Sequence, residues 1–216
     1  NLYTFTDYHL GMLAWHKEGG SDWNISIAER TIIAALQQMI EQSPKAHTAV
    51  INIQGDEPAM HPSVIEQVID MATQNKTFDI ITAACSFERS VDIFNHNMVK
   101  VIIDNARRAL YFSRSPIPFI RGNQPFLPTS LNPSLLAHFH CHLGIYAYRT
   151  NALTRFAGLP IDPIENLEKL EQLRALRQGM SIGVAPARYL SLGVDTPEDV
   201  PLVEALLTHN GLFKHI

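Results

Sequence analysis

The sequence lacks the features that mark membrane-spanning and nucleic-acid-binding proteins. No apolar run approaches the roughly 18 residues that a membrane-spanning helix needs, and no charged-then-apolar leader begins the chain. Lysine and arginine form no runs, the formal net charge is -4 and the pI is about 6.2. We therefore expect neither a membrane nor a nucleic-acid partner, although a few arginines can still serve one pocket for a small anion.

Cysteine is also scarce, since the chain has two cysteines, Cys85 and Cys141. Both lie in apolar stretches that are typical of buried strands. Two buried free thiols are favoured over a disulfide, which fits the reducing environment of the cytoplasm.

What the sequence does contain is enough apolar material for one sizeable core. It has 216 residues, of which 46% are hydrophobic and 18% charged. Disorder would require fewer apolar residues and a larger charge imbalance. We expect residues 1–216 to form a single domain.

The first half of the chain has the pattern of an α/β protein. Apolar residues at helical spacing predict a helix over 27–42, and a β-branched run predicts a buried strand over 49–53. A helix over 63–74 and a strand over 79–84 follow. Strand, helix and strand at this spacing predict a βαβ unit with a right-handed crossover, and hence a mostly parallel sheet.

The middle of the chain has a different pattern. Short strands over 98–103 and 109–112 around Asp104-Asn105 predict a hairpin. Proline-rich residues 121–137 predict a long loop, and a strand over 140–148 follows. Residues 98–140 are therefore expected to form a small lobe of hairpin and loop.

The last third returns to alternating helices and strands. A leucine stripe predicts a helix over 165–177, and a strand is expected over 181–185. Thr196 is the expected N-cap of a final helix that Asn210-Gly211 ends.

Two acidic clusters stand where elements meet. The first, at 54–58, contains Asp56 directly after a buried strand, and the second, at 193–199, contains Asp195 before the last helix. Ligands of open α/β sheets lie beyond the carboxyl ends of strands, and two carboxylates there can hold one Mg²⁺ against a nucleotide phosphate. The alternative is that both clusters are turns, with Asp195 favouring the helix N-terminus.

Three further places carry candidate binding residues. Arg114 could bind a carboxylate or phosphate, or be a surface loop residue. His142 shares a strand face with His140, so a zinc pair is conceivable, but a pocket or core histidine is favoured. Glu171-Gln172 could line a site or form a solvated helix face.

Together these stretches resemble the CMP-KDO synthetases, the 3-deoxy-manno-octulosonate (KDO) cytidylyltransferases. The resemblance covers about 49–207 and is carried by six segments in order. They are Asn52–Pro58, Val99–Val101, Ala109–Arg114, His142–Arg149, Leu170–Arg174 and Gly193–Asp199.

The resemblance implies a nucleotide-diphospho-sugar-transferase-like α/β fold, with a mixed, mostly parallel sheet between helices and a small β-rich dimerisation lobe. It implies transfer of CMP from CTP to the 2-hydroxyl of KDO or a close analogue, with release of pyrophosphate. Mg²⁺ is the implied cofactor, and the family is cytoplasmic, commonly dimeric and serves lipopolysaccharide synthesis.

The resemblance also implies a role for each candidate residue. Asp56 and Asp195 would be catalytic metal ligands. The residues implied to bind substrate are Gln54, Arg114, His142, Tyr146, Glu171 and Gln172, with Arg114 near the sugar carboxylate or the dimer edge.

The chain departs from the family at its beginning. The family opens with a strand and a loop of arginine, glycine and lysine that grips the triphosphate, and residues 1–48 contain no such motif. We therefore expect the chain to be incomplete relative to the family at its N-terminus. Two other readings stay open: a non-catalytic paralogue that binds the sugar acid, and a cytidylyltransferase for another acid such as a sialic acid.

Overall fold

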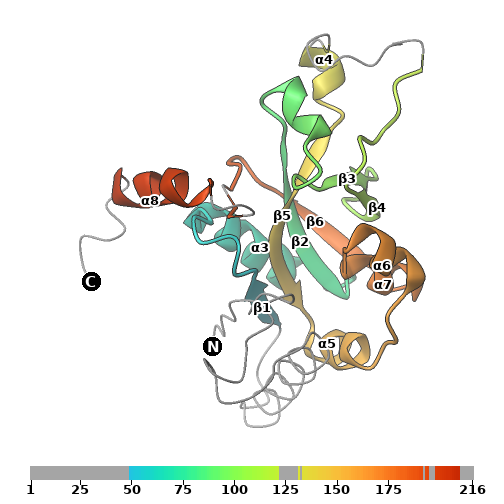
Figure 1. The fold of residues 1–216 in the computed structure, drawn as a ribbon. Coiled ribbons are helices and arrows are strands. Elements are labelled where there is room, and N and C mark those ends of the chain that lie inside the picture. Colours follow the sequence, from blue (N-terminus) through green and yellow to red (C-terminus); the bar gives the residue numbers. More distant parts are fainter. Residues whose placement is uncertain (1–48, 122–130, 132, 192, 195–197, 210–216) are drawn as a thin grey trace, which may run out of the picture.

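The computed structural model describes residues 49–121, 131, 133–191, 193–194 and 198–209 (Figure 1). The helix expected over 27–42 and the N-cap Thr196 lie outside these residues. The strands are β1 (Val50–Ile53), β2 (Ile80–Ser86), β3 (Lys100–Ile103), β4 (Ala109–Ser113), β5 (His140–Tyr148) and β6 (Ile182–Pro186). The helices are α3 (Pro62–Gln74), the 3-10 helix η1 (Ser90–Phe94), α4 (Pro133–Leu136), α5 (Thr150–Ala157), α6 (Pro163–Glu168), α7 (Gln172–Arg177) and α8 (Val200–His209).

The sheet is organised around β5. The strand order is β4-β3-β5-β2-β6, and β1 also pairs with β5. Since β2 runs along one edge of β5 for its whole length, β1 and β3 share the other edge. Residues 141–148 of β5 are all buried, as expected for a strand that is covered on both faces.

The expected α/β sheet between helices is present, but the expectation that it is mostly parallel is wrong. In the described part of the chain, β2 and β6 are the one parallel pair, and the other pairings are antiparallel. Strands β1 and β2 do point the same way, because each is antiparallel to β5. The βαβ pattern predicts their direction correctly, but β5 comes from much later in the sequence and lies between them.

Each face of the sheet packs against its own helices (Figure 1). On one face, Val64, Val68 and Ala72 of α3 pack with apolar residues of β2 and β5. On the other face, α5 and α7 pack against Tyr146 and Tyr148. Alternate residues of β5 therefore supply two separate cores, which follows from the two-residue period of a strand.

The expected hairpin is present as β3 and β4. Asp104 stabilises its turn, because one side-chain oxygen accepts the N–H groups of Ala106 and Arg108, both at 2.8 Å. Arg107 has φ of 66°, the left-handed conformation that lets the chain turn back. Aspartate in this position is a common way to close a tight turn.

The single helix expected over 165–177 is instead two short helices, α6 and α7. Lys169 ends α6 in the left-handed conformation, with φ of 53°. Two groups at the end of β4 bind the carboxylate of Glu168: the hydroxyl of Ser113 at 2.7 Å and the N–H of Arg114 at 2.9 Å. These long-range bonds, which helical periodicity cannot reveal, hold the chain at the break.

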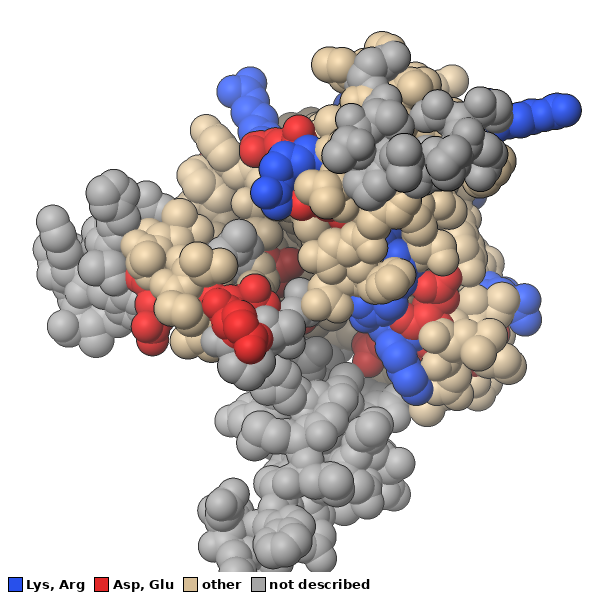
Figure 2. All heavy atoms as spheres, turned by 45° about the horizontal axis from the view of Figure 1, so that its top comes forward, with Lys and Arg blue, Asp and Glu red and all other residues tan. Residues whose placement is uncertain are grey.

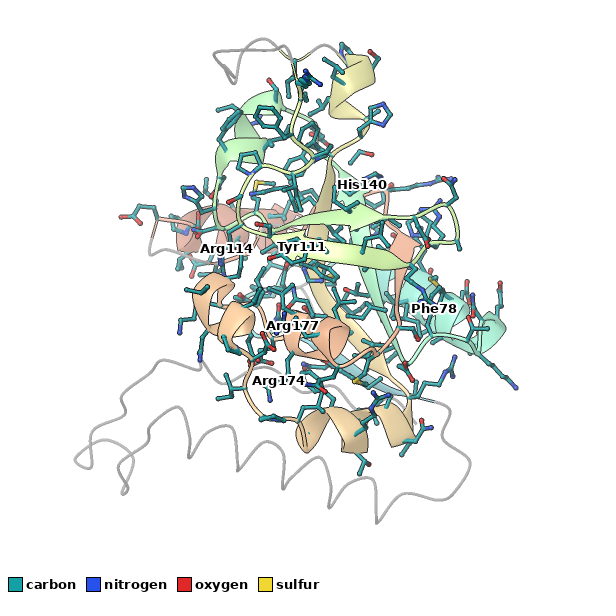
Figure 3. The ribbon with its side chains drawn as sticks, turned by 90° about the vertical axis from the view of Figure 1, so that its right-hand side faces the viewer. Phe78, Tyr111, Arg114, His140, Arg174 and Arg177 are labelled. Atoms are coloured by element: carbon teal, nitrogen blue, oxygen red, sulfur yellow. The ribbon has the colours of Figure 1, made fainter. Side chains whose placement is uncertain are left out.

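A buried ion pair joins the two short helices. Arg174 of α7 donates to both carboxylate oxygens of Glu165 on α6, at 2.7 and 2.9 Å. Glu165 also accepts the N–H of Asp162 in the capping box that starts α6. Figure 3 shows Arg174 and Arg177 on α7, below the hairpin end that carries Arg114.

Replacing Arg174 with leucine should lower the free energy of unfolding by about 3 kcal/mol, because the Glu165 carboxylate would stay buried without its cation. The matched control is Arg177→Leu, because the Arg177 side chain is 55% exposed and its partner Asp162 would keep the N–H of Ile164. The loss of stability in this control should be much smaller, since water screens the exposed guanidinium. Urea unfolding measures both, and equal losses would contradict the structural role of the buried pair.

Candidate active site

A cavity lies where β1 and β3 separate along the shared edge of β5. The N–H of Gln54, just after β1, donates to the carbonyl of Gly144 at 2.8 Å. The N–H of His142 donates to the carbonyl of Val99, just before β3, at 2.8 Å. The edge of β5 between these two bonds opens into a cavity of about 630 Å³. A position at diverging strand ends is where α/β sheets commonly bind ligands.

Seven of the eight site residues predicted from sequence line this cavity, and the eighth, Asp195, lies outside the described residues. The seven come from four separate parts of the chain. They are Gln54, Asp56, Arg114, His142, Tyr146, Glu171 and Gln172.

The cavity lining has mixed charge. Among the described residues it contains four carboxylates (Asp56, Glu57, Glu165, Glu171) and three basic side chains (Arg114, Lys169, Arg174). Figure 2 shows acidic and basic side chains interspersed over one face of the molecule. Such a lining suits a ligand that combines anionic groups with hydroxyls, or anions together with a cation.

Asp56 has the properties of a cation ligand. Its Oδ1 atom is buried and has no hydrogen-bond partner among the described residues. The Asp56 carbonyl accepts the N–H of Val194 at 2.7 Å, and the residue after Val194 is Asp195. The backbones of the two acidic clusters therefore meet. No group of three or more possible metal-ligating side chains occurs within the residues that the structure describes.

Gly144 allows two polar side chains to approach β5 closely. Its N–H donates to Oε1 of Glu57 at 3.2 Å. A Cβ atom at this position would overlap Oε1 of Gln54 and lie 3.0 Å from Cγ of Glu57. The absence of a side chain at Gly144 is therefore what lets Gln54 lie over the strand.

His142 is held inside the sheet by Thr82 of β2. Its Nε2 lies 2.9 Å from the Thr82 hydroxyl oxygen, and Phe112 contacts the ring edge-on at 5.1 Å between centroids. Burial lowers the pKa of His142 to about 3. The ring is therefore neutral near pH 7 and can offer one N–H donor and one acceptor.

Tyr146 continues a row of rings from His142 along β5. The His142 and Tyr146 centroids lie 5.5 Å apart, and Tyr148 follows at 5.8 Å. Burial raises the pKa of Tyr146 well above its ordinary value, and Tyr148, Glu171 and nearby acids raise it further. Tyr146 is therefore a neutral phenol, suited to hydrogen bonding and not to removing a proton.

Arg114 directly follows β4 (Figure 3), and its surroundings are joined by hydrogen bonds to backbone carbonyls. Its guanidinium donates to the carbonyls of Glu168 at 2.7 Å and His96 at 2.9 Å. Lys100 is completely buried and donates to the carbonyls of Asn95, Met98 and Arg114. Burial lowers the pKa of Lys100 to about 8. These bonds place Arg114 at the cavity. Its Nε and Nη1 atoms already donate to backbone carbonyls of the protein.

The break between α6 and α7 brings Glu171 and Gln172 to the cavity. Gln172 is buried, whereas Glu171 is exposed. Because the chain breaks between α6 and α7, Glu171 and Gln172 line the cavity and do not lie on the solvated face of one continuous helix.

Several polar residues of the lining were not predicted from the sequence. They are Glu57, Asn97, Glu165, Asn166, Lys169, Arg174 and Ser191. Glu57 could have been chosen, because it belongs to the same acidic cluster as Asp56. The position of Lys169 depends on its left-handed backbone, for which the sequence has no signal.

The two cysteines are buried and free, as expected from the sequence. They are direct partners across β2 and β5. Within the described ranges, none of the helices combines the length and the apolar character that crossing a bilayer requires.

Comparison with known proteins identifies the family. Residues 24–182 match the family described as "Cytidylyltransferase". The chain belongs to the cytidylyltransferase family. This confirms the kinship that the ordered motifs indicate.

Several curated relatives of the chain are KDO cytidylyltransferases. The 3-deoxy-manno-octulosonate cytidylyltransferase of Thermodesulfovibrio yellowstonii is 44% identical over 158 residues, which are 73% of this chain and 60% of that enzyme. The enzyme of the same name from Neisseria meningitidis serogroup C is 40% identical over 161 residues, which are 74% of this chain and 62% of that enzyme. The chain thus spans about three-fifths of the length of these curated relatives.

A solved structure shares the fold. It is CMP:2-keto-3-deoxy-manno-octonic acid synthetase complexed with CTP, with a TM-score of 0.69 and 28% identity. The match covers 84% of this chain and 68% of that chain. The mixed sheet with flanking helices is therefore the fold of a CTP-binding member of the family.

Stability should fall in mild acid because of His142. Its pKa is about 6.5 in the unfolded chain and about 3 in the fold, so the unfolded state binds the proton first as pH falls below 6.5. Between pH 6.5 and about 5, this residue should remove about 2 kcal/mol from the free energy of unfolding. Urea unfolding at several pH values, compared with His142→Gln, isolates the effect. Parallel pH profiles for the two proteins would contradict it.

Proposed function

We propose that this protein transfers CMP from CTP to the 2-hydroxyl of KDO or a close analogue and releases pyrophosphate. The observation that carries the proposal is the convergence of seven sequence-predicted site residues on one cavity, in a chain that belongs to the cytidylyltransferase family. The similarity to KDO cytidylyltransferases points to the same sugar acid.

In the proposed reaction the sugar 2-hydroxyl oxygen bonds to the α-phosphorus of CTP. The bond from that phosphorus to the bridging oxygen breaks, pyrophosphate leaves with the electron pair, and the hydroxyl proton passes to water. The chain would contribute mainly by binding and orienting the two substrates, because phosphoryl transfer depends on positioning and charge stabilisation.

The acidic end of the cavity fits a Mg²⁺ ion. The buried Oδ1 of Asp56 is a hard oxygen donor without a described hydrogen-bond partner, and Mg²⁺ prefers such ligands together with substrate phosphates. Asp56 and Asp195 would hold the ion, and the contact between Asp56 and Val194 supports their convergence. When bound, Mg²⁺ would neutralise charge on the phosphate oxygens.

The other side of the cavity fits the sugar acid. His142, Tyr146 and Gln172 are neutral hydrogen-bonding side chains that suit sugar hydroxyls, and they are buried enough to exclude water. Arg114 would attract the sugar carboxylate, since guanidinium groups pair well with carboxylates. Gln54, just after β1, and Glu171, just before α7, would complete the pocket.

We also propose that the protein acts as a homodimer in the cytoplasm, where CTP is available. The lobe at 98–140 offers a surface for self-association. In the described part of the sheet β4 is an edge strand, and Leu110, Tyr111 and Phe119 are exposed apolar residues on or just after it.

Asp56→Asn should reduce pyrophosphate release from CTP, KDO and Mg²⁺ at least 100-fold, because an amide binds Mg²⁺ poorly and removes a charge that positions the phosphates. The matched control is Asp70→Asn, on the exposed side of α3. Its rate should equal that of the unmodified protein. Coupled detection of pyrophosphate measures all three proteins.

Two outcomes would contradict the proposed function. Calorimetry that shows KDO binding without CTP binding would favour a non-catalytic sugar-acid-binding protein. Faster turnover with a sialic acid than with KDO would favour a cytidylyltransferase for that acid.

Gly144→Ala should weaken KDO affinity about 10-fold while changing the free energy of unfolding by about 1 kcal/mol or less. The new methyl group would displace the side-chain oxygen of Gln54 and crowd Cγ of Glu57, which are both at the cavity. Gly158→Ala is the matched control, because the nearest atom to its Cβ would lie at 3.6 Å. Calorimetry and urea unfolding check the two effects, and unchanged KDO affinity in Gly144→Ala would argue against Gln54 as a sugar ligand.

A further inference from the structure

The hydroxyl of Thr82 is shared between the ring of His142 and the backbone of β5. Its oxygen lies 2.7 Å from the carbonyl of Ile145, 2.9 Å from Nε2 of His142 and 3.4 Å from the carbonyl of Leu143. Thr82 has no exposed surface. The group is therefore shielded from water, and its hydrogen bonds are confined to these neighbours.

A register shift explains why Thr82 binds a carbonyl of β5. Thr82 pairs with Tyr146, and the next residue of β2, Ala83, pairs with Leu143. Gly144 and Ile145 thus have no partner on β2 at this point. Since a buried carbonyl requires a donor, the Thr82 hydroxyl is well placed to satisfy that of Ile145.

This arrangement determines which nitrogen of His142 carries the proton. The threonine hydroxyl has a single hydrogen, and the carbonyl of Ile145 is its closest acceptor. The contact between Thr82 and Nε2 must then be a hydrogen bond that the ring donates. In a neutral ring with a proton on Nε2, Nδ1 is an acceptor, and burial keeps this ring neutral.

The other nitrogen remains available to a ligand. The Thr82 contact occupies Nε2 and leaves Nδ1 for another partner, and His142 lines the cavity. Phe112 and Tyr146 contact the ring and restrict its rotation. The protein therefore presents a fixed acceptor, which suits the hydrogen of a hydroxyl group.

We propose that Thr82 is a positioning residue that holds His142 as the Nε2–H tautomer, so that Nδ1 accepts a hydrogen bond from a hydroxyl of the sugar acid. The part that concerns the sugar rests on the proposed function, whereas the tautomer does not. Thr82 itself touches no substrate and acts through the ring.

Nitrogen NMR of the ¹⁵N-histidine-labelled protein tests the tautomer without substrate. His142→Gln identifies the signals of this ring by their loss. The unmodified protein and Thr82→Ser should both show a protonated Nε2 and an unprotonated Nδ1. Thr82→Val, which keeps the shape but removes the hydroxyl, should show a mixture of tautomers. A proton on Nδ1 in the unmodified protein, or an unchanged tautomer in Thr82→Val, would overturn the proposal.

Calorimetry with KDO tests the consequence for binding. Thr82→Val should weaken affinity about 3- to 10-fold, the effect of one lost hydrogen bond, and Thr82→Ser should restore it. Circular dichroism shows whether the variants fold. Equal affinity in Thr82→Val despite a changed tautomer would overturn the role in binding. Absence of KDO binding by the unmodified protein would refute the sugar ligand and the proposed function, while the NMR result would still decide the tautomer.

Discussion

Two strands pair with the same edge of β5, and the cavity exists because they separate there. β1 leaves β5 at Gly144, and β3 joins it at His142. The described pairing of β1 with β5 stops at Ile145 and that of β3 at Cys141, so the side chains that follow β1 can reach β5 between them, as Glu57 does when it accepts the N–H of Gly144. Gln54, Asp56 and Glu57 line the cavity because β1 ends at this gap, and Gly144 leaves room for Gln54.

The polar lining depends on backbone carbonyls as much as on pairs of charges. Lys100 and Arg114 donate to carbonyls of the segments around them, and Glu168 accepts from the end of β4. These bonds connect the hairpin to the break between α6 and α7. The same break brings Glu171 and Gln172 to the cavity, so hydrogen bonds connect this wall of the cavity to the hairpin.

Much of the local structure could be predicted from the sequence. The strand over 140–148 and the hairpin around Asp104 follow from apolar runs and turn chemistry, and the structure has them at or near those bounds. The prediction of one helix over 165–177 was wrong, because the leucine stripe continues past Lys169 and gives no sign of a break. Hydrogen bonds from Ser113 and Arg114 to Glu168 hold the chain where the first helix ends. Helix α5 was not predicted, since eight residues contain too few turns to establish a period.

The sequence by itself determined the family, the chemical types of the site residues and the separate strands and helices, because these depend on residue identity and short-range spacing. The tertiary structure alone decided that β5 lies between β1 and β2, that Asp56 and Val194 meet, and that Thr82 holds His142. Each of these is a contact between residues distant in the chain. Such contacts follow from hydrogen bonds satisfied across the sheet and from the packing of its two faces. Local sequence periodicity carries no information about either.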